Sequence, residues 1–70
     1  MTRAEHLRWA KDRALAELPD LASAFGSMLS DLGKHPELLH HPGKELGVML
    51  NVGGHLNTVA KMKEWIEGFN

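Results

Sequence analysis

The absence of cysteine is the feature that most restricts the folds open to this chain. The sequence has 70 residues and no cysteine, so no disulfide can stabilise it and no thiolate can bind a metal ion or act as a nucleophile. A chain of this length lies near the lower limit for a domain that folds alone. Two sources of stability are left, close packing between helices and association between copies of the chain. We therefore expect one domain over residues 1–70 that forms a homo-oligomer.

The charge balance excludes several classes of partner. Eight basic and nine acidic residues give a net charge of −1 and are spread along the chain, which offers no general attraction to nucleic acid or to an anionic membrane. The longest apolar stretch, residues 46–56, is interrupted by Asn51 and His55 and is too short to cross a bilayer. No basic segment precedes an apolar one at the start, as a signal peptide requires. We expect a cytoplasmic protein with neither membrane nor nucleic acid as its partner.

Capping residues, prolines and glycines divide the chain into helical segments. Thr2 and Glu5 have the spacing of a capping box. Pro19 ends the helix that follows, because a proline disfavours the helical conformation of the residue before it. Asp20 and Asn57 are suitable N-caps for later helices. We expect four helices, over residues 3–18, 21–32, 43–52 and 58–67.

Three of these segments carry an apolar stripe at helical spacing, which predicts an all-α bundle of four short helices. The residues expected in the core are Leu7, Ala10, Ala14 and Leu18; Leu21, Phe25, Met28, Leu29 and Leu32; and Val59, Met62, Ile66 and Phe69. The segment 43–52 is apolar on nearly every side, and few positions in so small a monomer are buried all round. Leu46, Val48, Met49 and Val52 are therefore expected at a subunit interface.

Trp9 lies off the apolar stripe of the first helix. At about 100° per residue it shares a face with His6 and Arg13, and Trp with Arg is a combination that binding surfaces favour. This face is a candidate platform for a partner or ligand, with Lys11 beside it and Lys34 and His35 as further candidates. Two other interpretations stay open: another helix covers Trp9 as a second core face, or Trp9 lies at an oligomer interface.

The histidines and the segment 41–44 carry weaker signals. Residues 41–44 (HPGK) place Lys44 at a helix start, where free N–H groups attract anions, although a proline-initiated helix explains the same spacing. No chelating pattern such as H-E-x-x-H is present, so we expect neither a metal site nor a cofactor, and interpret the remaining histidines as solvated or capping residues. The histidines considered as metal ligands are His35, His40, His41 and His55.

The sequence offers little for catalysis. Ser23, Ser27 and Ser30 lie at helical spacing on the polar side of the second helix, and no glycine elbow, carboxylate pair or base accompanies them. We therefore expect a protein that is not an enzyme.

Several runs resemble a group of short proteins of tailed bacteriophages whose function is unknown. These runs are residues 6–14 (HLRWAKDRA), 27–37 (SMLSDLGKHPE), 54–56 (GHL) and 66–70 (IEGFN). The resemblance covers almost the whole chain and implies a phage origin and action in the cytoplasm of an infected bacterium. It implies no mechanism and no catalytic residues. Small accessory phage proteins often bind a host enzyme, a defence complex or a nucleotide signal, which is an analogy of context.

Three functions follow as hypotheses. The first is an accessory protein that binds and inhibits a host macromolecule through Trp9, Arg13 and His6. The second is an oligomeric sponge for a nucleotide immune signal, in which Trp9 stacks on the base while Arg13, Lys11 and Lys44 hold phosphates. The third is a small nucleic-acid-binding regulator, which the neutral charge disfavours.

Overall fold

The computed structural model describes all 70 residues, with four helices and no strand. The all-α prediction is confirmed. Its helices are α1 (Arg3–Glu17), α2 (Leu21–Leu32), α3 (Pro42–Val52) and α4 (Val59–Glu67). Three boundaries differ by one residue from expectation. Leu18 is the C-cap of α1, and α3 begins at Pro42 rather than Gly43. Thr58 rather than Asn57 is the N-cap of α4, because the Thr58 hydroxyl accepts a hydrogen bond from the Lys61 N–H.

Local hydrogen bonds begin the first two helices as the sequence indicates. The Thr2 hydroxyl accepts from the Glu5 N–H at 3.1 Å, and the Glu5 carboxylate accepts from the Thr2 N–H at 3.0 Å. At α2 the Asp20 carboxylate accepts from the Ser23 N–H at 3.1 Å and from the Ser23 hydroxyl at 2.9 Å. These bonds favour the charged carboxylates, so they hold the pKa values of Glu5 and Asp20 below their ordinary values.

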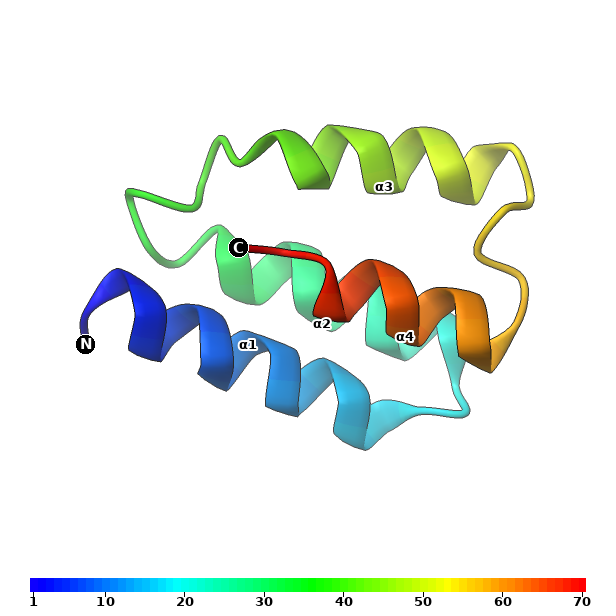
Figure 1. Cartoon of the computed structure of the whole chain (residues 1–70), viewed down its shortest axis with the longest axis horizontal. Coiled ribbons are helices and arrows are strands. Elements are labelled where there is room, and N and C mark those ends of the chain that lie inside the picture. Colours follow the sequence, from blue (N-terminus) through cyan, green and yellow to red (C-terminus); the bar gives the residue numbers. More distant parts are fainter.

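The core lies between α1, α2 and α4. In Figure 1, α1 is at the bottom of the view, α3 at the top, and α2 and α4 lie between them. The buried apolar residues are Leu7, Ala10, Ala14, Ala24, Met28, Leu32, Leu38, Leu56, Met62, Trp65, Ile66 and Phe69. None of these residues belongs to α3, whose only contribution is Leu50, partly buried and packed against the core.

The expected core was correct in most positions and wrong in one. Leu18, Leu21, Phe25 and Leu29 are only partly buried, although they pack against the core. Val59 is 42% exposed, because α4 buries its later residues and Val59 stands at its first position. Four core residues were not expected: Ala24, Leu38, Leu56 and Trp65. The largest of them is Trp65, three residues after Met62 on the same side of α4.

Two glycines of α3 lie against aromatic side chains from the C-terminal part of the chain. The indole N–H of Trp65 donates to the Gly43 carbonyl at 3.2 Å. A Cβ atom added at Gly47 would lie 2.7 Å from the indole nitrogen of Trp65, and one added at Gly43 would lie 2.7 Å from Cε2 of the Phe69 ring. The aromatic rings can approach the α3 backbone this closely only because both positions lack a side chain.

Replacing Gly47 tests this packing. Gly47→Ala is expected to destabilise the protein by about 1–3 kcal/mol, because the new methyl group overpacks against Trp65 and outweighs the roughly 1 kcal/mol gain in helix propensity. The matched control is Gly26→Ala in α2, where an added Cβ meets nothing within 4 Å; it should stabilise by about 0.5–1 kcal/mol. Urea unfolding measures both, and equal stabilisation by the two variants would contradict the packing.

The cap of α2 predicts a pH dependence. Because the folded pKa of Asp20 lies below its ordinary 3.8, its contribution to stability is present above that value and is lost as the pH falls through the folded pKa. Asp20→Asn keeps a good cap that does not titrate. The variant should therefore lose less stability than the parent as the pH falls below about 4, as measured by urea midpoints. Equal losses in the two proteins would contradict this assignment.

Candidate functional site

One cluster of polar and aromatic side chains joins α1 to the C-terminal end of α2. We call it the Trp9 cluster; its members are His6, Trp9, Arg13, Asp31, Lys34 and His35. Five of these six were predicted as partner- or ligand-binding residues, and the structure brings all five together. The sixth, Asp31, was not singled out from the sequence.

Asp31 is the centre of the cluster and is only 1% exposed. Its carboxylate accepts from Nε of Arg13 at 2.8 Å and from Nζ of Lys34 at 3.0 Å. Its main-chain carbonyl accepts from Nε2 of His6, which is also buried, at 2.6 Å. A buried carboxylate is tolerated when cations and hydrogen bonds compensate it. These contacts tie α1 to the end of α2.

Trp9 lies among the positive charges that Asp31 holds. The guanidinium carbon of Arg13 is 4.8 Å and Nζ of Lys34 is 5.7 Å from the centre of the Trp9 ring, within the range of cation–π attraction. The ring of His6 is 5.1 Å away. Trp9 itself is partly buried and packs against the core. Part of the indole therefore serves packing, and the rest reaches the surface beside two cations.

The cluster presents hydrogen-bond donors that have no acceptor within the chain. Arg13 uses only its Nε, so its two terminal nitrogens are free, and the indole N–H of Trp9 makes no hydrogen bond. No buried polar side-chain atom lacks a partner, so these donors reach the surface. The side chains of Arg13 and Lys34 are 52% and 56% exposed. The surface of the cluster is suited to a ligand or partner that supplies acceptors.

The structure places Lys11 and Lys44 away from this cluster. Nζ of Lys11 donates to the main-chain carbonyls of Glu67, at 3.0 Å, and of Phe69, where it stabilises the C-terminal end of α4. Nζ of Lys44 donates to the Leu39 carbonyl at 3.2 Å. The three basic groups expected to hold phosphates together, with Arg13 as the third, therefore bind three different parts of the chain.

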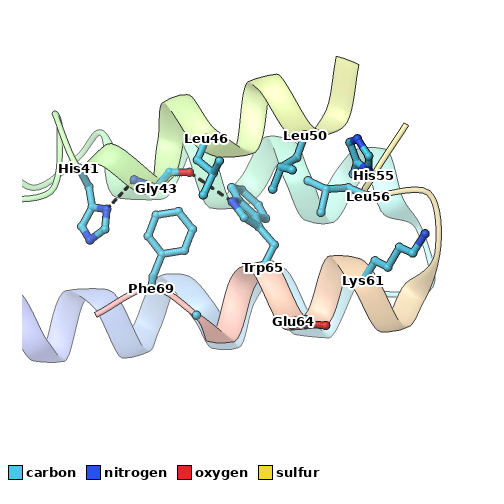
Figure 2. Close-up of a pocket in the computed structure, with 11 residues that line it drawn as sticks. His41, Gly43, Leu46, Leu50, His55, Leu56, Lys61, Glu64, Trp65 and Phe69 are labelled. Atoms are coloured by element: carbon cyan, nitrogen blue, oxygen red, sulfur yellow. Dashed lines mark hydrogen bonds between the residues drawn. The ribbon is translucent and has the colours of Figure 1, made fainter. Parts of the chain in front are cut away.

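A groove of about 380 Å³ lies between α3 and α4. Figure 2 shows the Trp65 ring in its middle, the Phe69 ring at the end near His41, and Lys61 and Glu64 toward the other end. Its lining is His41, Gly43, Leu46, Leu50, His55, Leu56, Lys61, Glu64, Trp65, Gly68 and Phe69. The sequence analysis missed this groove. The paired spacing of Gly43 and Gly47 in α3 was a signal for close approach of another element.

The four residues predicted at a subunit interface are all exposed in the single chain. Met49 is 72% exposed and Val52 84%, and Leu46 and Val48 are also exposed. At helical spacing Val48, Met49 and Val52 lie on the side of α3 opposite Gly47.

The remaining histidines do not form a cluster. His41 is the N-cap of α3: its Nδ1 accepts from the Gly43 N–H at 2.9 Å, and its Nε2 is 2.9 Å from the Asn70 carbonyl. No group of three or more His, Asp or Glu side chains is arranged to hold a metal ion. None of the four helices has the length and apolar character that a bilayer span requires.

Comparisons with protein-family models, with curated proteins and with solved structures found no match to this chain.

Replacing Asp31 tests the centre of the Trp9 cluster. Asp31→Asn leaves the Arg13 and Lys34 charges without their carboxylate, so we expect a destabilisation of about 1–3 kcal/mol. The matched control is Asp12→Asn, which removes an exposed carboxylate bonded to Arg8 and should cost at most about 0.5 kcal/mol. Urea unfolding of both variants decides the matter, and a loss no larger at Asp31 than at Asp12 would contradict the central role of Asp31.

Proposed function

We propose that the protein is a non-enzymatic binding protein that holds an acidic segment of a protein partner on the Trp9 cluster and thereby blocks that partner. One observation carries the proposal: two cations whose remaining donors are free lie beside one aromatic ring, and a buried carboxylate fixes the position of both cations. Hydrogen-bond donors that are already held in position lose less conformational entropy when a ligand binds.

The chemistry of the free donors favours carboxylates. The terminal nitrogens of Arg13 form a planar fork that matches a carboxylate in a bidentate pair. Lys34 adds a second positive charge, and the indole of Trp9 supplies an N–H and an apolar edge for neighbouring side chains. Tryptophan and arginine are also the residues that most often dominate the energy of protein interfaces.

A protein partner fits these groups better than a nucleic acid or a nucleotide. Asp31 offsets one of the two positive charges, and the whole chain carries a net charge of −1, whereas nucleic-acid binding depends on many phosphate contacts. The nucleotide-sponge hypothesis needs Lys11 and Lys44 beside Arg13, and both lysines donate to main-chain carbonyls elsewhere.

The resemblance to short proteins of tailed bacteriophages supports a specific setting for this binding. We infer that the partner is a host protein in the cytoplasm of an infected bacterium, and that occupying its acidic surface inhibits it. An anti-defence or host-takeover role has the same basis, which is an association of context.

The two tryptophans allow a direct test. A Glu-rich peptide titrated into ¹⁵N-labelled protein should shift the indole N–H signal of Trp9, whose N–H is free, in NMR spectra. The indole N–H of Trp65 donates to Gly43 and is the internal reference, which should stay in place. Because the attraction is between surface charges, the shift should weaken as salt is raised from about 50 to 500 mM.

Two variants sharpen this titration. Arg13→Gln should abolish the shift of the Trp9 signal. Arg8→Gln removes the same charge from another side of α1, where Arg8 pairs with Asp12 and Glu67, and should leave the shift unchanged. A salt-independent shift of the Trp9 signal, or one that survives Arg13→Gln, would refute the proposal. A larger shift with single-stranded DNA than with the peptide would also refute it, because it would identify nucleic acid as the ligand of the Trp9 cluster.

A further inference from the structure

Basic side chains from two different helices hold residues 68–70, which we call the strap. The carbonyl groups of the strap accept hydrogen bonds from two residues of α1 and from the N-cap residue of α3. These bonds run from Arg3 to Asn70 at 2.8 Å, from His41 to Asn70 at 2.9 Å, and from Lys11 to Phe69. The strap therefore ties α1 to the start of α3, and Figure 1 shows the C-terminus between these two elements.

The ring of Phe69 packs the strap against the start of α3. Phe69 is only 4% exposed, and its ring centre lies 4.9 Å from that of His41 and 5.2 Å from that of Trp65. The ring lies so close to the α3 backbone that a Cβ atom added at Gly43 would clash with it. Figure 2 shows the ring at the end of the groove near His41. The strap thus closes this end of the groove with an aromatic contact as well as hydrogen bonds.

Little else holds α3 on the other three helices. Gly47 is its only buried residue, and Leu50 is the only one of its side chains that packs against the core. In α2, by contrast, Met28 and Leu32 are completely buried. An element with few buried apolar contacts opens at a lower free energy than the core of the same protein. Of the four helices, α3 is therefore the one whose release breaks the fewest buried contacts.

Two buried leucines set the limits of the segment that such a release would include. Leu38 precedes α3 and Leu56 follows it, and both side chains belong to the core. The segment between them ends in two glycines and a histidine, and Gly54 has a φ of 76°, which glycine adopts without strain. Residues 39–55 can therefore move while the core residues on both sides stay in place.

We propose that residues 39–55, which include α3, open from the other three helices as one unit, and that the strap determines how often they open. In the closed state Trp65 is only 8% exposed. Opening breaks its hydrogen bond to Gly43 and uncovers the aromatic floor of the groove. An apolar ligand would reach this floor only in the open state, so the strap is a conformational gate of the groove. This proposal does not rest on the Trp9 cluster.

Amide hydrogen exchange of the full chain, followed by NMR, tests the opening. Relative to the rates of an unstructured chain, the amides of α3 should exchange at least about tenfold faster than those of α2, because they need only the local opening. The indole N–H of Trp65 should exchange with α3, since its acceptor Gly43 moves away with α3. Equal protection of α2 and α3, or a Trp65 indole that exchanges only with α2, would overturn the proposal.

Two variants separate local opening from global unfolding. Phe69→Leu removes the aromatic contact between the strap and His41 and should speed the exchange of α3 by about threefold to tenfold. Asp20→Ala removes the N-cap of α2 and should speed the exchange of α2 by about fivefold. It should leave α3 unchanged, because α2 stays folded in the open state. Exchange of α3 that responds to Asp20→Ala but not to Phe69→Leu would show that α3 exchanges only by global unfolding.

A variant in α1 tests the strap from its other end. Lys11 holds the strap but forms no hydrogen bond or ion pair with α3, so it can act on α3 only through the strap. In Lys11→Gln the strap must become ordered each time α3 closes, and α3 exchange should rise at least about threefold. Arg8→Gln removes the same charge from α1, where Arg8 pairs with carboxylates alone, and should leave it unchanged. Unchanged α3 exchange in Lys11→Gln would overturn the role of the strap. None of these rates depends on an acidic peptide at the Trp9 cluster.

Discussion

The contact of Trp65 with the backbone of α3 is the interaction on which the rest of this structure most depends. Leu50 is the only α3 side chain that packs against the core, and it is only partly buried. The position of α3 is therefore set mainly by the indole against Gly47, by the hydrogen bond from that indole to Gly43, and by the cap at His41. The indole is too small to fill the whole space between α3 and α4, so the groove extends on either side of it. The same contact occupies the Gly47 side of α3 and leaves the opposite side exposed. The groove and the exposed apolar side of α3 therefore have the same physical origin.

Asp31 imposes a second constraint, of electrostatic kind. A buried carboxylate destabilises a fold by several kcal/mol unless it is paired, and here one carboxylate has two cationic partners from different segments. The pairing fixes the side chains of Arg13 and Lys34 beside Trp9 without satisfying all their donors. A structural requirement at the end of α2 therefore produces an ordered donor surface, which explains why residues that stabilise the fold also serve as candidate binding groups.

The success of sequence reasoning followed the range of the interactions involved. Helix ends depend on neighbours within about four residues, and Thr2, Asp20 and Pro42 predicted them to within one residue. Trp9, His6 and Arg13 share one helix face, so their proximity was also predictable. The role of Asp31 was not predicted, although a charged residue directly before the buried Leu32 indicates a carboxylate that needs a partner. Lys11 could not be placed from the sequence, because its carbonyl partners lie 56 and 58 residues away and exist only once α4 packs on α1.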